Sequence, residues 1–295
     1  MQTNLSTMNT TETTTEIIAQ NAATESTLVI GGNGKTGRRI VQRLEEMGEN
    51  VRVGSRASTP AFDWTDRSTW KEALCGATSI YISYHPDLAA PGASDAIRKL
   101  VEEAGKNDVE RLVLLSGRGE EEAQLCEAIV MDSDIPSTVV RASWFNQNFR
   151  ENFIRDMIVD GTIYLPVGNV LEPFIDADDI ADVAVAALTE AGHEGEIYEV
   201  TGPELLSFAE TAEKLSEATG REIRFQQIPH EAFIEGLRSQ QLPAELVSLL
   251  DYLFTQVLDG RNAYLSDGVQ RALGREPIDF SSYAEKAFEQ GYWNS

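Results

Sequence analysis

The glycine-rich segment at residues 31–37 is where residue type and spacing most clearly predict chemistry. Gly31, Gly34 and Gly37 recur at intervals of three, directly between an apolar run and a helical pattern. Gly31 permits a tight turn, Gly34 lets a pyrophosphate approach the backbone, and Gly37 lets the helix pack closely on the strand. The helix N-terminus adds unpaired N–H groups and positive potential. The predicted dinucleotide-binding residues of this turn are Gly31, Asn33, Gly34, Lys35, Thr36 and Gly37.

A phosphate loop of the NTPase type is the competing interpretation, because a lysine and a threonine follow Gly34. That loop requires four residues between its glycines and a Gly-Lys-Thr or Gly-Lys-Ser ending. The glycine spacing at residues 31–37 does not match this pattern, so the sequence does not predict an ATPase.

The end of the second apolar run, Gly54-Ser55-Arg56, predicts which dinucleotide binds. NAD-binding proteins usually carry an acidic residue about 20 positions after the glycines, where it binds the adenosine 2′-hydroxyl. A guanidinium suits a 2′-phosphate instead, because it forms charge-assisted hydrogen bonds. Ser55 and Arg56 therefore predict NADP(H), and Arg38 and Arg39 are further candidate phosphate contacts. The alternative interpretation is that these arginines are simply solvated.

Strand-like and helix-like segments alternate from residue 28 to residue 140, and this order predicts the fold that carries the turn. Apolar runs predict strands at 28–30, 51–53, 79–82, 112–115 and 138–140. Helical spacing predicts helices at 38–47, 69–74, 93–104 and 120–131. Such alternation is typical of a doubly wound parallel sheet. We therefore expect an α/β Rossmann fold that binds its ligands at the carboxyl ends of the strands.

Composition divides the chain into three segments. Residues 1–26 are rich in Thr, Asn and Ser and poor in apolar residues, which predicts a disordered tail. Residues 27–145 contain the strand and helix alternation and form the predicted NADP-binding Rossmann core. In residues 146–295 we expect the remaining sheet elements and a smaller, mainly helical C-terminal substrate lobe. The elements predicted there first are a helix at 147–158, a strand at 162–164, a helix at 178–188 and a strand at 197–200.

Several motifs resemble the NmrA-like family of atypical short-chain dehydrogenase/reductases, over almost everything after the tail. Within that family the chain is most similar to the branch of agroclavine dehydrogenase-like ergot-alkaloid reductases and NAD(P)H:quinone oxidoreductase-like proteins. We expect a small molecule, the substrate, as the binding partner. The sequence leaves open whether the protein forms a homodimer. The matching segments are residues 31–37, 55–56, 62–64, 68–70, 113–116, 141–149, 173–181 and 198–203.

The resemblance implies which residues lie on the adenine and ribose side of the site. Asp63 and Trp64 would follow the third strand beside the adenine. Ser83, Tyr84 and His85 would follow the fourth strand near the ribose, where an imidazole at a strand's carboxyl end could titrate.

The resemblance also implies which residues lie near the nicotinamide. Ser116 would end the fifth strand there, and Trp144 and Phe145 would line the same side of the cleft. For Trp64, Trp144 and Phe145, ordinary packing in the core is an equally good interpretation.

The chain lacks the catalytic pair of typical short-chain dehydrogenases, a Tyr followed four residues later by a Lys. After Ser116, residues 117–127 contain neither. The acceptor must then need no such general acid, as holds for a quinone, an iminium ion or an enone. We predict an NADPH-dependent oxidoreductase, in which Ser116, Tyr84 or His85 could polarise a substrate oxygen. The alternatives are a non-catalytic NADP(H) sensor and, less favoured, a sugar-nucleotide epimerase.

Charge and composition exclude other classes of function. The 48 acidic and 24 basic residues give a formal net charge of -24, which repels nucleic acid. No stretch is apolar over the roughly 18 residues that a membrane span needs, so we expect a cytoplasmic protein without membrane contact. Cys75 and Cys126 lie far apart and are predicted to be reduced, buried thiols. The three scattered histidines do not predict a metal site.

Overall fold

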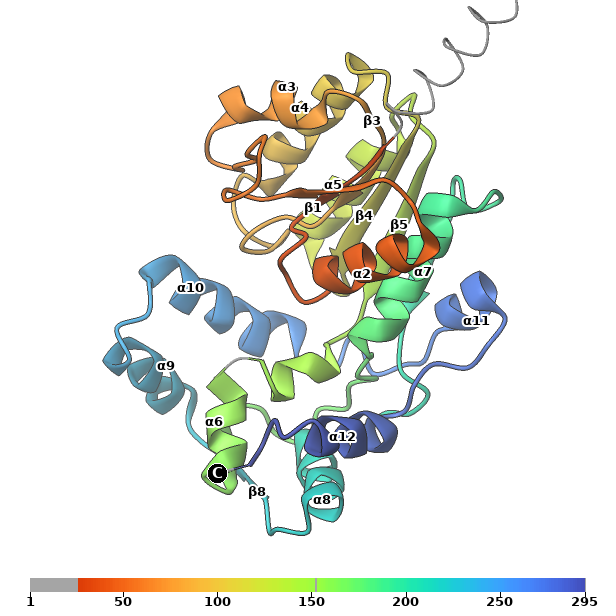
Figure 1. Cartoon of the computed structure of the whole chain (residues 1–295). Helices are drawn as coiled ribbons and strands as arrows, with labels where there is room; N and C mark the ends of the chain where they lie inside the picture. The colour runs from red at the N-terminus through yellow and green to blue at the C-terminus, as the bar shows by residue number, and fades with distance from the viewer. Residues whose placement is uncertain (1–25, 152, 295) are drawn as a thin grey trace, which may run out of the picture.

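A parallel sheet forms the centre of the upper part of the molecule in Figure 1. The computed structural model describes residues 26–151 and 153–294, so the predicted tail lies outside the described residues, apart from Ser26 at the start of β1. The sheet confirms the predicted α/β Rossmann fold. Its strands, in spatial order, are β2 (Val51–Gly54), β1 (Ser26–Ile30), β3 (Ala77–Ile82), β4 (Arg111–Gly117), β5 (Ser137–Ala142) and β7 (Ile197–Val200).

The order of the strands determines where a ligand can bind. β2 pairs with one edge of β1 and β3 pairs with the other, all in parallel. The chain therefore leaves β1 toward one side of the sheet and leaves β3 toward the other. Such a reversal opens a crevice at the carboxyl ends of the two strands.

Helices cover both faces of this sheet, which explains the continuous apolar runs in the sequence. In β1, Leu28 and Ile30 pack into the core of one face and Val29 into the core of the other. A strand that is buried on both faces needs apolar residues at every position. The helices on the Leu28 face are α3 (Trp70–Leu74), α4 (Ala93–Gly105) and α5 (Glu121–Met131). Those on the Val29 face are α2 (Gly37–Met47), α7 (Ala177–Thr189) and α11 (Gly268–Leu273).

The segment between β2 and α3 differs from the expectation. The strand expected before Asp63 does not form in the described residues, where Asp63 and Asp66 make only an isolated bridge before the 3-10 turn η1 (Arg67–Thr69). The hydroxyl of Ser58 donates to the Ser55 carbonyl at 2.7 Å, which curls the chain into a turn. Pro60 has no N–H to donate to a neighbouring strand. Asp63 therefore follows the second strand, Ser83 the third, and Ser116 lies in the fourth.

The rest of the chain builds the lower part in Figure 1, around a core of its own. Three phenylalanine rings pack at its centre. Phe149 packs edge to face on both Phe174 and Phe280, with ring centroids 5.4 and 5.1 Å apart. The rings of Phe174 and Phe280 are tilted to each other, with centroids 5.9 Å apart. β6 (Thr162–Leu165) and β8 (Arg224–Gln227) form a separate parallel pair. The helices of this part are α6 (Phe153–Val159), α8 (Phe208–Thr219), α9 (His230–Ser239), α10 (Ala244–Tyr252) and α12 (Phe280–Glu289).

The helix predicted over 147–158 is two shorter elements, the 3-10 turn η2 (Asn146–Phe149) and α6. The buried Gln147 side chain donates to Asp176 at 2.8 Å and accepts from the N–H of Ala177 at 2.8 Å. These bonds tie η2 to the start of α7. The helix predicted over 147–158 is therefore interrupted between η2 and α6. A π-helical turn, η3 (Leu253–Val257), extends α10. In the part of the chain that the structure describes, none of the helices has the length and apolar character to cross a membrane.

We predict that Gly37→Ala destabilises the fold. A Cβ atom at residue 37 would lie 2.2 Å from the carbonyl oxygen of Gly31, so α2 must move away from the turn. Overpacking of this kind costs about 1–3 kcal/mol in the free energy of unfolding. Gly105→Ala is the matched control, because a Cβ atom at Gly105 meets no atom within 4 Å. Urea unfolding of both variants would contradict the prediction if the two were equally stable.

Candidate functional site

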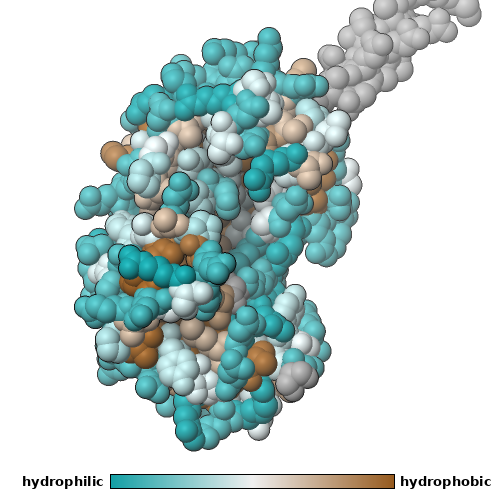
Figure 2. All heavy atoms as spheres, turned by 90° about the vertical axis from the view of Figure 1, so that its left-hand side faces the viewer, coloured by the Kyte–Doolittle hydropathy of each residue, from teal (hydrophilic) through white to brown (hydrophobic). Residues whose placement is uncertain are grey.

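A cleft of about 770 Å³ lies at the carboxyl ends of the strands. It brings together every residue that the sequence predicted for the site except Gly37, whose role is to let α2 approach the turn. Figure 2 shows one face of the molecule, where hydrophilic residues predominate and hydrophobic ones gather mainly near the level of α10. The predicted residues that line the cleft are Gly31, Asn33, Gly34, Lys35, Thr36, Ser55, Arg56, Asp63, Trp64, Ser83, Tyr84, His85, Ser116, Trp144 and Phe145.

The turn before α2 presents a helix N-terminus to the cleft. Gly31 has a φ of +77°, and its carbonyl accepts from the N–H of Gly34 at 2.8 Å, which closes the turn. No side chain caps α2, and its first turn contains no acidic residue. The Thr36 hydroxyl instead accepts from the buried hydroxyl of Tyr81 at 2.8 Å. The positive end of α2 is therefore available to an anion such as a pyrophosphate.

Lys35 connects this turn to the lower part of the molecule. Its ammonium donates to the side-chain oxygen of Asn148 in η2 at 2.6 Å. Burial lowers the pKa of Lys35, although Glu151 opposes the effect. Arg38, which we considered as a phosphate contact, forms an ion pair with Glu151 at 2.6 Å. Sequence spacing alone could not show that residues 148 and 151 lie beside the glycine turn.

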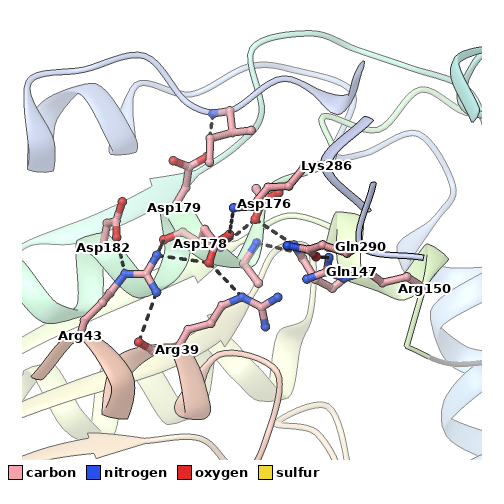
Figure 3. A network of polar contacts seen from close by, with 12 residues as sticks. Arg39, Arg43, Gln147, Arg150, Asp176, Asp178, Asp179, Asp182, Lys286 and Gln290 are labelled. Carbon is pink, nitrogen blue, oxygen red and sulfur yellow. Dashed lines mark hydrogen bonds and ion pairs between the residues drawn. The ribbon is translucent and has the colours of Figure 1, made fainter. Parts of the chain in front are cut away.

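An ion-pair network holds α2 against α7 (Figure 3). Arg39 donates to Asp178 at 3.0 Å, and Arg43 donates to Asp182 at 2.5 Å. Lys286 of α12 reaches the same Asp178 at 3.2 Å. Arg39 is buried in this network, where its ion pair with Asp178 stabilises the position of α2.

One group of residues that line the cleft contains an exposed cation, Arg56, and an aromatic side chain, Trp64. The Asp63 carboxylate accepts from the N–H of Thr65 at 2.9 Å, and this bond and the one from the Thr65 hydroxyl lower the pKa of Asp63. Trp64 packs edge to face on Tyr84, with ring centroids 4.8 Å apart, and its indole donates to the Ser83 carbonyl at 3.3 Å.

Ser116, near the end of β4, is hydrogen-bonded into a network of charged residues. Its hydroxyl donates to Glu127 at 2.6 Å, and Glu127 is also paired with Arg141. Arg118 is paired with Glu199 at 2.9 Å. The hydroxyl hydrogen of Ser116 is therefore committed to a carboxylate rather than directed at the cleft.

Three acidic residues that the sequence did not single out also line the cleft: Asp87, Glu120 and Glu172. Burial raises the pKa of Glu120 well above its usual range, and the adjacent Asp87 adds to the effect. Burial also raises the pKa of Glu172 to about 7. Glu120 lies in the stretch 117–127 that the sequence analysis considered. No spacing in the sequence indicated that Glu120 would face Asp87, which lies in the loop after β3.

The two cysteines differ in exposure. Cys126 is buried as expected, but Cys75 is exposed, because it lies at the end of α3 where the chain turns on the surface. Among the residues that the structure describes, no group of three His, Cys, Asp or Glu side chains is placed to hold a metal ion.

Comparison with known proteins identifies the family. The model of the NmrA-like family matches residues 123–283, more than half of the chain. The chain belongs to the NmrA-like family. Festuclavine synthase II of Penicillium roqueforti is 30% identical to this NmrA-like chain over 282 residues, covering 88% of the chain and 96% of that protein. Prestalk A differentiation protein A of Dictyostelium discoideum is 29% identical over 280 residues, covering 89% and 92%.

A solved structure has the same fold as this NmrA-like chain. The NADPH-dependent quinone oxidoreductase of Escherichia coli, solved as a complex with NADPH, superposes with a TM-score of 0.75. It is 19% identical in sequence and is covered over 99% of its length, against 89% of this chain. The likeness supports the Rossmann fold.

We predict that Glu172→Gln changes how stability depends on pH. The folded state raises the pKa of Glu172 from 4.5 to about 7, so it binds a proton that the unfolded chain has released. The free energy of unfolding therefore falls as pH rises from about 4.5 to above 7, by about 3 kcal/mol for this carboxyl.

The measurement is urea unfolding of both proteins at pH 5 and pH 8. Glu172→Gln should lose less stability over this interval than the wild type. Glu222→Gln is the control, since Glu222 is exposed on the surface. An equal loss in Glu172→Gln and the wild type would show that Glu172 does not retain the proton.

Proposed function

We propose that this NmrA-like chain is an NADPH-dependent oxidoreductase for a small organic acceptor of the quinone, iminium or enone type. The observation that carries the proposal is the cleft itself, which extends from the glycine turn and Arg56 to an apolar and aromatic wall. Among the proteins of similar structure and sequence, one is an NADPH-dependent quinone oxidoreductase and one a festuclavine synthase. NADPH, when bound, supplies the hydride.

The residues of the cleft fit this cofactor. The uncapped N-terminus of α2 suits the pyrophosphate, and an exposed guanidinium at Arg56 suits a 2′-phosphate. The neighbouring Ser55 can donate a hydrogen bond to the same phosphate. The remaining residues proposed to contact the cofactor are Asn33, Lys35, Thr36, Asp63, Trp64, Ser83, Trp144 and Phe145.

The second half of the chain supplies the wall that would face the acceptor. We infer that residues 27–145 bind the cofactor and that residues 146–295 add the last sheet elements and a substrate lobe. An apolar wall excludes water from the reacting groups and holds a flat acceptor in place. The apolar residues of this wall are Phe153, Leu250, Leu253, Val257 and Leu258.

Three polar residues that line the cleft have different roles in the proposal. Tyr84 is half-buried, and burial raises its pKa, so its hydroxyl stays protonated and can donate to an acceptor oxygen. His85 is exposed and lines the cleft, where its ring can form a hydrogen bond with an acceptor oxygen. Ser116, near the end of β4, acts indirectly, because its hydroxyl donates to Glu127 of α5 and holds it in place.

Cofactor preference tests the proposed role of Arg56. NADPH should bind at least about tenfold more tightly than NADH, since one charge-assisted contact contributes roughly 1.5–3 kcal/mol. Arg56→Asp should abolish or invert this preference in calorimetric titrations. Arg98→Asp makes the same change of charge at an exposed position on α4 and should leave the preference intact. Equal affinities of the wild type for the two cofactors would reject the role of Arg56.

Turnover tests the proposed reaction. The purified protein should oxidise NADPH in the presence of at least one acceptor from a panel of quinones, imines and enones, followed by the loss of NADPH absorbance. Tight NADPH binding without turnover on any of them would reject the oxidoreductase. It would favour a non-catalytic NADP(H) sensor, whose affinity for its partner should differ between NADP and NADPH.

A further inference from the structure

Glu172 is a carboxyl group with an unused hydrogen-bonding atom. The side chain lines the cleft, yet the residue is only 2% exposed. Its backbone is held in place by an antiparallel bridge to Leu206, with N–H···O distances of 2.9 and 3.0 Å. Oε1 accepts from the N–H of Trp144 at 3.3 Å, whereas Oε2 has no partner among the described residues. Buried polar atoms without a partner are rare, and they indicate that something else binds there.

Among the described residues, none forms an ion pair with the Glu172 carboxyl group. The charged group that faces it is Arg118, whose guanidinium donates to Glu199 at 2.9 Å and to the carbonyls of Asn262 and Tyr264 at 3.3 and 3.2 Å. The same guanidinium stacks on the Tyr264 ring, 4.3 Å from its centroid. Burial of an unpaired carboxylate is costly, so the neutral acid is favoured. A neutral carboxyl can donate a hydrogen bond.

Trp144 supplies a second unused donor on the same wall. Its indole Nε1 is buried and has no partner in the described part of the chain. The ring is held edge to face against Phe254, with centroids 5.3 Å apart. The donor is therefore positioned by packing, and a ligand that enters the cleft can supply the acceptor.

Two other acidic residues of the cleft, Asp87 and Glu120, are hydrogen-bonded to each other. Asp87 also accepts from the N–H of Ala89 at 2.8 Å. The Glu120 carboxyl lies against Gly117, where a Cβ atom would come within 2.4 Å of its oxygen. This pair has its partners within the protein, whereas Oε2 of Glu172 has none among the described residues.

We propose that Glu172, as a neutral carboxylic acid, hydrogen-bonds to the oxygen of a neutral conjugated carbonyl acceptor and gives it a proton during reduction. This inference rests on the proposed function, since the hydride comes from NADPH. A C–H bond forms at the conjugated carbon, the displaced π electrons move to the oxygen, and the oxygen takes the Glu172 proton. Glu172 is left as a carboxylate and regains a proton from water.

The proposal narrows the class of acceptor. An iminium ion becomes a neutral amine when it gains a hydride, so its reduction needs no proton. A proton donor is of use only to a neutral acceptor such as a quinone or an enone. The acceptor that Glu172 selects is therefore a neutral conjugated carbonyl compound.

Binding of menadione to the NADP⁺-loaded protein tests this without turnover. Calorimetry from pH 5.5 to 8.5 should show affinity falling by about tenfold or more, because the neutral acid is lost above a pKa of about 7. At pH 8, buffers of different ionisation enthalpy should report uptake of up to one proton for each menadione bound. Glu172→Gln should bind menadione with no pH dependence and no proton uptake, since an amide donates without titrating.

Two further variants separate the alternatives. Trp144→Phe should weaken menadione binding several-fold at every pH and leave the pH dependence unchanged. Glu120→Gln should retain the pH dependence. Loss of that dependence in Glu120→Gln but not in Glu172→Gln would overturn the proposal, as would no menadione binding at any pH or a wild-type affinity that does not change with pH.

Single-turnover reduction of menadione by the NADPH-loaded protein then separates this proposal from the proposed function. In the wild type the rate should fall above pH 7, and in Glu172→Gln it should be at least about tenfold lower at pH 6 and independent of pH. Menadione binding with the expected pH dependence but no oxidation of NADPH would reject the oxidoreductase and keep the carbonyl site at Glu172. Turnover of an iminium dye alone would reject the carbonyl site.

Discussion

The close approach of α2 to the turn after β1 is the constraint on which the site depends. A Cβ atom at Gly37 would lie 2.2 Å from the Gly31 carbonyl, so only glycine lets the helix start this near the strand. That position points the uncapped N-terminus of α2 into the cleft. A small outward shift of α2 would take its N–H groups away from the place where the pyrophosphate is proposed to bind.

Arginine side chains make this arrangement compatible with an excess of acidic residues. The chain carries a formal charge of -24 and yet is proposed to bind an anionic cofactor. Near α2, the carboxylates of Asp178 and Asp182 are paired with Arg39 and Arg43 (Figure 3). Paired charges contribute little field at a distance. The local positive potential of the helix N-terminus can then act on a phosphate despite the charge of the whole protein.

Polarity changes along the cleft in the direction that the proposed chemistry requires. The end at Arg56 is exposed and charged, which suits a solvated phosphate. At the other end Glu172 is buried beside the half-buried Trp144, and burial keeps its carboxyl group protonated near neutral pH. One cleft thus combines an electrostatic binding region with a region where water is excluded and proton transfer is controlled by burial.

The sequence by itself determined the glycine turn, the parallel sheet and the order of its elements, because each depends on residues close together in the chain. Spacing of apolar residues and glycines reports local geometry directly. Only the tertiary structure decided that Ser116 donates to Glu127, that the strand before Asp63 is replaced by a turn, and that Asn148 holds Lys35. It also decided that Glu172 lies in the cleft with an Oε2 atom that has no partner among the described residues. These features depend on which distant segments pack together and how much water they exclude, and no local pattern encodes either.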